Sequence, residues 1–136
     1  MEILDAPEET AKPSFSLVTP EFARSFADAW VAAWNAHDFE RILSHYTDDF
    51  SMASPFIPGI AGEPSGRLRG KEAIGAYWKA ALERYPDLRF TLHTVFCGAD
   101  TVAILYESVG GRTAIEHFRF DAAGLVCEAS GQYDRI

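Results

Sequence analysis

Apolar residues recur with the period of a helix through the first part of the chain. Between Pro20 and Asn35 large aromatic side chains occupy every fourth position, and they are Phe22, Phe26, Trp30 and Trp34. Residues spaced four apart lie along one side of a helix, so this segment is predicted to be a helix with one aromatic face. Asp38 is expected to cap a second, short helix and, with His37, to form the corner between the two.

A third helix is predicted over residues 71–85. Its apolar residues follow the i, i+3, i+4 spacing of an amphipathic helix, and Pro86 ends it. The preceding segment 55–66 holds three prolines and three glycines. That is too many for regular structure, so a loop is expected there. Its apolar residues, such as Phe56, suit a lid or the rim of a pocket.

The apolar period changes to two in the later part of the chain, which predicts strands. A short strand is expected at 50–54, and the later strands are expected at 88–97, 101–108, 113–121 and 125–134. Short turns join the later four, so these strands must run antiparallel. Helices followed by a meander of strands predict an α+β fold, with the helices on one face of the sheet.

The length of 136 residues fits one domain, 18–136, preceded by a flexible acidic tail, 1–17. A net charge of −8 without a basic cluster argues against a nucleic-acid partner. No secretory leader and no apolar run of transmembrane length are visible, so a cytoplasmic location away from membranes is expected. Cys97 and Cys127 match no metal spacing and are expected to be free thiols.

One carboxylate falls on a predicted apolar strand face. Glu116 shares that face with Ala114, Phe118 and Phe120. A buried carboxyl must find a partner or become neutral, and both outcomes are common at functional sites. Glu116 is therefore the candidate catalytic residue, and the alternative is a structural glutamate paired with an arginine. Glu107 joins this face in one register of the neighbouring strands and faces solvent in another, and the solvent-facing register is preferred.

The other titratable residues offer weaker candidates. The four histidines show no metal-ligand spacing, so no metal site and no cofactor are predicted. His45 and His93 can carry protons near neutral pH, but structural or exposed roles are preferred for both. His117 is expected to face outward. Asp48 and Asp49 look like a catalytic pair, yet their place between a helix and a strand favours capping and turn formation.

Aromatic residues make up 13% of the chain, more than a small core needs. They line either a cavity for a flat hydrophobic ligand or a densely packed core, and the sequence fits both. If they line a cavity, its wall is formed by side chains from the first and third predicted helices, the short strand, the loop and the late strands. The predicted ligand-binding residues are Trp30, Trp34, Met52, Ser54, Phe56, Tyr77, Trp78, Phe118 and Tyr133.

Three motifs follow one another along the chain. They are W-x3-W-N-x-H-D-x4-L-x2-Y-x-D-D-F at 30–50, G-x2-A-I-x2-Y at 70–77 and R-F-D-x2-G-x-V at 119–126. In this order and spacing they resemble the SnoaL-like branch of the nuclear transport factor two-like superfamily. The resemblance implies a cone-shaped, mostly antiparallel sheet wrapped around three N-terminal helices, a pocket at its open end, and frequent dimerisation.

The resemblance also bears on chemistry. Ketosteroid isomerases of this superfamily have a tyrosine on the first helix, a general-base aspartate on the first strand and a protonated aspartate on the strand leading into R-F-D. Those places hold Trp30, Ser54 and Glu116 here. The resemblance therefore implies that only the third carboxyl is retained, as a glutamate.

Two functions follow from these observations. The first is binding of a small hydrophobic molecule in an apolar pocket, with cofactor-free isomerisation, cyclisation or hydration by Glu116. The second is a non-catalytic ligand-binding or dimerisation module. A homodimer through the outer face of the sheet is expected, because the late strands carry apolar residues on both faces. A carboxyl–tyrosine or carboxyl–histidine pair in an open pocket favours the first function, and a pocket filled by side chains favours the second.

Overall fold

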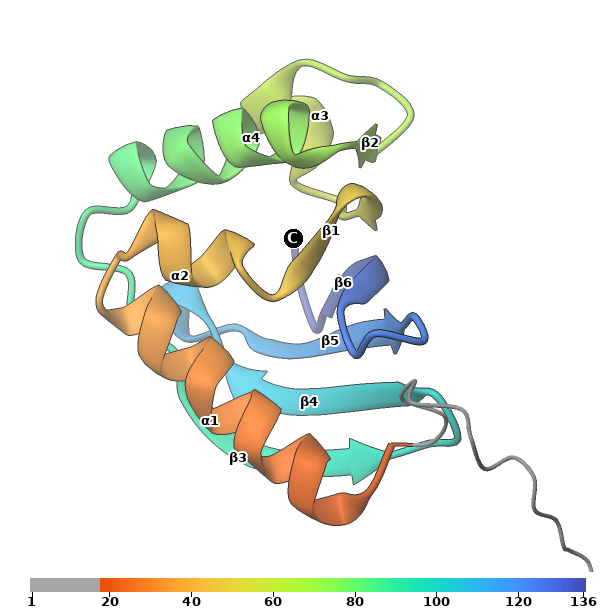
Figure 1. Ribbon diagram of the computed structural model, residues 1–136. Helices are drawn as coiled ribbons and strands as arrows, with labels where there is room; N and C mark the ends of the chain where they lie inside the picture. Colours follow the sequence, from red (N-terminus) through yellow and green to blue (C-terminus); the bar gives the residue numbers. More distant parts are fainter. Residues whose placement is uncertain (1–17) are drawn as a thin grey trace, which may run out of the picture.

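The computed structural model describes residues 18–136, which form helices packed against one face of a single sheet (Figure 1). The helices are α1 (Pro20–Asn35), α2 (Phe39–Leu43), α3 (Ile57–Ala61) and α4 (Lys71–Arg84). The strands are β1 (Tyr46–Ala53), β2 (Arg67–Arg69), β3 (Thr91–Cys97), β4 (Thr101–Glu107), β5 (Thr113–Phe120) and β6 (Val126–Tyr133). The predicted α+β class is confirmed, and the predicted tail at 1–17 lies outside the described residues.

The six strands are arranged in the order β2-β1-β6-β5-β4-β3. Strands β3 to β6 form the predicted antiparallel meander. Strand β1 pairs in parallel with β6, the last strand of the chain, and antiparallel with β2. The sheet is therefore mixed but mostly antiparallel, and its early and late parts meet at the β1–β6 pair (Figure 1).

The helical hairpin at the start of the domain forms for local reasons. The Thr19 hydroxyl accepts a hydrogen bond from the Phe22 amide at 3.0 Å and caps α1. His37 takes a left-handed conformation with φ of 54° and turns the chain after α1. Asp38 then caps α2 by accepting a hydrogen bond from the Arg41 amide at 3.2 Å. The predicted corner at His37 and Asp38 is confirmed.

The prediction of a loop over 55–66 is wrong where Ile57–Ala61 form helix α3. Pro58 lies in the first turn of this helix, where the missing N–H would have no intrahelical partner in any case. Gly62 follows the last turn with φ of 78°, the left-handed conformation that commonly ends a helix. The proline and the glycine therefore mark the two ends of a short helix.

Asp48 and Asp49 do not cap a helix, so that prediction is also wrong. Helix α2 ends at Leu43, and β1 begins at Tyr46, four residues before the predicted strand. Both aspartates are exposed on β1, and they form ion pairs with Lys71 at 3.6 Å and Arg69 at 3.7 Å. The error has a physical reason. Apolar residues four apart, as at 46 and 50, share one face of a helix and also one face of a strand.

Two further sequence expectations concern the chain as a whole. Within residues 18–136 no helix combines the length and the apolar character needed to cross a membrane. Cys97 and Cys127 are both free thiols, as expected.

Candidate functional site

A cavity of about 70 Å³ lies between the inner face of the sheet and helices α1, α3 and α4. Ligand pockets for drug-sized molecules usually measure roughly 300–1,000 Å³, so this one accepts only a compact group or a few water molecules. Its wall is mostly aromatic, and Glu116 is the one carboxyl that borders it. The predicted ligand-binding residues that line it are Trp30, Trp34, Met52, Phe56, Tyr77, Trp78 and Tyr133.

Two residues of the predicted ligand-binding set, Phe118 and Ser54, do not line this cavity. The Phe118 ring is fully buried, with its centroid 4.8 Å from that of Phe26 and 5.3 Å from that of Trp30. Ser54 borders a separate open groove of about 630 Å³ on the outer side of the sheet. Strand β1 ends one residue earlier, so the alternation of faces no longer holds at Ser54.

Strand β5 places Glu116 on the inner face of the sheet. Exposed and buried residues alternate strictly along this strand, and Glu116 is only 3% exposed. The Tyr106 hydroxyl donates a hydrogen bond to Glu116 Oε1 at 3.2 Å. Glu116 forms no ion pair with any residue of 18–136, so the arginine-paired alternative is wrong. Burial raises the pKa of Glu116 to about 8, and the hydrogen bond from Tyr106 opposes part of this rise.

Further hydroxyl groups in the cavity wall lie close to the hydrogen-bonded pair of Glu116 and Tyr106. The Tyr133 hydroxyl lies close to those of Tyr106 and Ser54, which oppose part of the rise in its pKa. The Tyr77 hydroxyl donates a hydrogen bond to Ser54 Oγ at 3.4 Å. Burial raises the pKa values of Tyr77, Tyr106 and Tyr133 above their ordinary value. These hydroxyls therefore stay protonated at neutral pH, and Glu116 is the acid of this network that titrates nearest neutrality.

Two residues of this network were missed by the sequence reasoning. Tyr106 shares the inner face of β4 with Val102 and Ile104, so its parity was the available signal. Gly131 lies opposite Glu116 in the β5–β6 pair. A Cβ atom at Gly131 would lie 3.1 Å from Glu116 Oε1 and 3.3 Å from the Tyr133 hydroxyl. The glycine thus makes room for both groups, and a glycine inside a predicted strand was the signal.

The two tryptophans of α1 differ in their N–H groups. Trp30 Nε1 donates a hydrogen bond to the Tyr46 hydroxyl at 2.9 Å. Trp34 lines the cavity and is 5% exposed, and its Nε1 has no hydrogen-bond partner among residues 18–136. Buried donors are nearly always paired in folded proteins, so an unpaired one on a cavity wall is available to a ligand acceptor.

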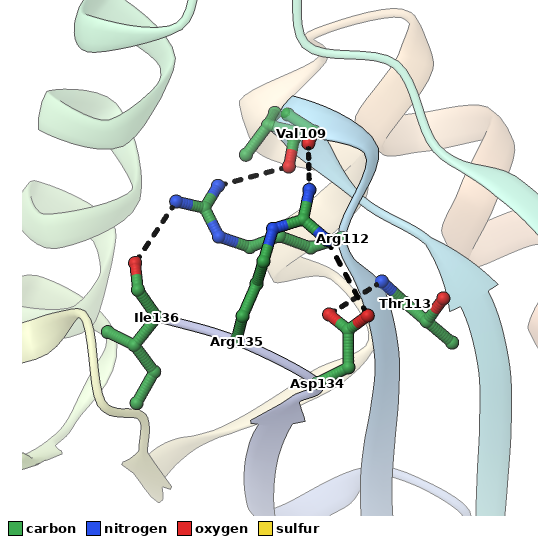
Figure 2. Close-up of polar contacts among 7 residues, drawn as sticks. Val109, Arg112, Thr113, Asp134, Arg135 and Ile136 are labelled. Atoms are coloured by element: carbon green, nitrogen blue, oxygen red, sulfur yellow. Dashed lines mark hydrogen bonds and ion pairs between the residues drawn. The ribbon is translucent and has the colours of Figure 1, made fainter.

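The cavity adjoins an open groove of about 360 Å³ between residues 84–89 and 108–110, called the vestibule below. One lip is the 3-10 turn at Val109–Gly111. Arg112 donates hydrogen bonds to the Val109 carbonyl at 3.1 Å and to the Ile136 carbonyl at 3.3 Å, and Figure 2 shows how its guanidinium bridges the two. The Arg135 guanidinium donates to the Gly110 carbonyl at 2.6 Å. This lip is therefore fixed by side chains.

The other lip is the backbone around residues 88–90. His37 Nε2 hydrogen-bonds with the Leu88 carbonyl at 3.0 Å. Asn35 accepts a hydrogen bond from the Phe90 amide at 2.7 Å and donates one to the Phe90 carbonyl at 3.0 Å. The corner between α1 and α2 therefore holds in place residues 88–90, which lead into β3 and border the cavity.

Glu107 does not join Glu116. It is exposed at the end of β4 and lies opposite Thr113, and the expected solvent-facing position is confirmed. The alternative pairing of Glu107 with Ala114 required a two-residue turn, whereas a 3-10 turn over Val109–Gly111 connects the strands.

The histidines also lie outside the cavity. His93 and His117 are exposed, and the outward orientation expected for His117 is confirmed. His45 packs edge-on against Phe26 with a centroid distance of 5.3 Å. Burial lowers the pKa of His45, and the Arg41 charge adds to the effect. In the described part of the chain no cluster of three or more His, Cys, Asp or Glu side chains is arranged to hold a metal ion.

Known proteins share this fold. A model of the SnoaL-like domain matches residues 27–129. A SnoaL-like protein of unknown function from Burkholderia thailandensis is 51% identical, with a TM-score of 0.83 over 86% of this chain and 98% of that one. A candidate isomerase of the SnoaL-like family from Agrobacterium tumefaciens is 18% identical, with a TM-score of 0.66 over 82% and 97% of the two chains. The candidate polyketide cyclase IdmH from Streptomyces antibioticus is 21% identical, with a TM-score of 0.69 over 82% and 91%. The last two similarities concern the fold alone.

Proposed function

Because the chain belongs to the SnoaL-like domain family, and because a single carboxyl borders its cavity, we propose that it acts on a small hydrophobic carbonyl compound by cofactor-free acid–base chemistry. The reaction class is isomerisation, cyclisation or hydration, and Glu116 is the catalytic residue. The observation that carries this proposal is the hydrogen-bonded pair of Glu116 and Tyr106 inside the cavity, at 3.2 Å.

The chemistry follows from the pKa of Glu116, about 8. At pH 7, Glu116 is neutral in most protein molecules. The neutral carboxyl donates a hydrogen bond to a ligand carbonyl oxygen, and this hydrogen bond acidifies the neighbouring C–H group. In the ionised fraction, Glu116 accepts a proton from the carbon next to the ligand carbonyl and returns it to another position. Trp34 Nε1 is then the donor to the ligand oxygen, because an ionised carboxyl cannot donate. A group whose pKa lies near the working pH serves both steps.

The size of the cavity limits what enters it. A volume of about 70 Å³ accepts a carbonyl group with a few neighbouring carbons. The remainder of a larger ligand must lie outside, in the direction of the vestibule. This volume also supports the alternative function, a non-catalytic ligand-binding or dimerisation module, because side chains already occupy most of the space inside the sheet.

The experiment that separates the two functions is proton exchange on a small ketone. Wild-type protein in D₂O should speed deuterium incorporation next to the carbonyl of 2-pentanone, followed by NMR. Glu116→Gln should abolish this exchange, because an amide cannot accept the proton. Glu107→Gln, an exposed carboxyl on the adjacent strand, serves as the matched control and should exchange like wild type. Binding of 2-pentanone without any exchange would favour the non-catalytic module.

A homodimer through the outer face of the sheet is a separate part of the proposal. Ile115 on β5 is 41% exposed and Phe96 on β3 is 52% exposed, both large apolar side chains. Exposed apolar patches commonly mark an interface. Sedimentation velocity at micromolar concentration should give a dimer for wild type and a monomer for Ile115→Lys. A monomeric wild-type protein would contradict this part alone.

A further inference from the structure

The vestibule offers a second binding site next to the cavity. Resting on the proposed function, we propose that it binds the carboxylate end of a ligand whose carbonyl end occupies the cavity. The substrate class is thereby narrowed to small oxo acids with an apolar stem. The two spaces share part of their walls, a serine lies where they meet, and the vestibule carries a net positive charge.

The two spaces are contiguous. Tyr85, Leu88, Ser108 and Val109 line both the cavity and the vestibule. Ser108 is 6% exposed and adds a hydroxyl to the walls of both spaces. A polar group of a ligand that passes from the cavity to the vestibule meets this hydroxyl at the junction.

The charges of the vestibule select an anion. Arg84 and Arg89 line it together with one carboxylate, Asp87. Neither arginine forms an ion pair with any residue in the described part of the chain. Two arginines against one aspartate leave a single net positive charge in a protein whose formal net charge is −8. A single positive charge matches a carboxylate better than a phosphate dianion, and arginine forms bidentate hydrogen bonds with carboxylates.

The vestibule is also preformed. Arg112 and Arg135 hold the Val109–Gly111 lip by hydrogen bonds to its carbonyls (Figure 2). The Arg112 guanidinium also lies over the Phe56 ring, 5.0 Å from its centroid. His37 holds the opposite lip at Leu88. A site with fixed walls loses little conformational freedom on binding, which favours affinity.

The volumes of the cavity and the vestibule fit the same placement of the two ends of the ligand. The cavity of about 70 Å³ takes the carbonyl end, and the vestibule of about 360 Å³ takes the stem and the carboxylate. The apolar junction residues Tyr85, Leu88 and Val109 suit the methylene groups between the two ends. A ligand that is apolar throughout would leave the two arginines of the vestibule without a partner.

Isothermal titration calorimetry on the full chain tests this with paired ligands. The probes are straight-chain methyl ketones of five to ten carbons that end in a carboxylate, such as 4-oxopentanoate, together with their methyl esters and 2-pentanone. The acid of optimal length should bind about tenfold more tightly than its ester, the advantage expected from one charge-assisted hydrogen-bonded pair. The advantage should disappear in Arg84→Ala/Arg89→Ala. It should persist in the control Arg24→Ala, an exposed arginine on α1.

The possible results are distinguishable. Equal affinity of acid and ester in wild type, or an acid preference that survives in the double arginine variant, would overturn the vestibule site while 2-pentanone still bound. Failure of 2-pentanone, acids and esters alike to bind would refute the proposed function and this site together. Both arginines are exposed, so the double variant should fold, and its far-UV circular dichroism should match wild type.

Discussion

The aromatic face of α1 has two halves that resemble each other in sequence and differ in what surrounds them. Phe22 and Phe26 pack edge-on against Phe120, at centroid distances of 5.1 and 5.0 Å, and Phe26 is buried in the core. Trp30 and Trp34, one and two turns further along, border the cavity. The first half forms a closed core, and the second half is the wall of a site.

The difference between the halves lies in the polar groups opposite the helix. Phe26 contacts Phe118 and Phe120 on β5. Trp30 also contacts Phe118, but the cavity that Trp30 and Trp34 border includes Glu116 of the same strand. A carboxyl cannot be packed as tightly as a phenyl ring without partners, so space, tyrosine hydroxyls and a glycine accompany it. One carboxyl on the otherwise apolar inner face of β5 therefore separates the site from the core.

The largest effect on stability should come from removing a buried aromatic ring from the closed half. Phe26→Ala should lower the free energy of unfolding by about 3–5 kcal/mol, because it removes a buried ring from a filled core. Trp34→Ala should cost clearly less, because one side of this ring already borders a cavity and lacks packing partners there. Urea denaturation of both variants measures the difference. Equal losses would mean that the two halves do not differ in packing.

The second effect concerns the cost of burying Glu116. Its pKa is raised from 4.5 to about 8, so the folded protein holds a proton that the unfolded chain releases over this range. Wild-type stability should fall as pH rises from 4.5 to 8, by on the order of 4 kcal/mol from this group. Glu116→Gln lacks this dependence and should therefore be the more stable protein at pH 8. Denaturation of both proteins at several pH values between 4.5 and 8 gives the comparison, and a constant difference between them would contradict it.

A third effect should come from filling the space opposite the carboxyl. Gly131→Ala should destabilise by about 1–3 kcal/mol, because its Cβ would lie 3.1 Å from Glu116 Oε1 and force the side chain to move. Gly59→Ala is the matched control, since a Cβ there meets no atom within 4 Å. Thermal denaturation distinguishes the two variants. A stable Gly131→Ala protein would show that the Glu116 side chain can relocate at little cost.

The smallest effect on stability should follow from Trp34→Phe. The ring remains while the unpaired N–H is removed, so the free energy of unfolding should change by less than about 1 kcal/mol. Binding of small ketones should weaken all the same, because the ligand loses a hydrogen-bond donor. Trp30→Phe provides the contrast, since it breaks the hydrogen bond to Tyr46 and should cost stability. A Trp34→Phe protein with unchanged ligand affinity would remove Trp34 Nε1 from the proposed site.

Sequence patterns within single helices and strands predicted much of the fold. The four-residue aromatic spacing predicted α1, and strict alternation predicted that Glu116 faces the interior, because each signal depends on one element alone. The bounds of β1, the partner Tyr106 and the space at Gly131 were not predicted. The β1 bounds were missed because a four-residue apolar spacing fits a helix and a strand alike. That Tyr106 and Gly131 meet Glu116 depends on cross-strand register, which the periodicity of one strand does not contain. The volume of the cavity is likewise a product of many side chains packed together.

The parallel pairing of β1 with β6 has a kinetic consequence. Tyr46 lies opposite Val126, so this pair closes a long loop, and its closure is expected to follow contacts of smaller sequence separation. Gly131 and Tyr133, which border Glu116, belong to the same late strand. If β6 docks after the rate-limiting step, Glu116 is desolvated only then, and its protonation leaves the folding rate unchanged. The pH dependence of stability should then appear in the unfolding rate, which should rise with pH as Glu116 ionises.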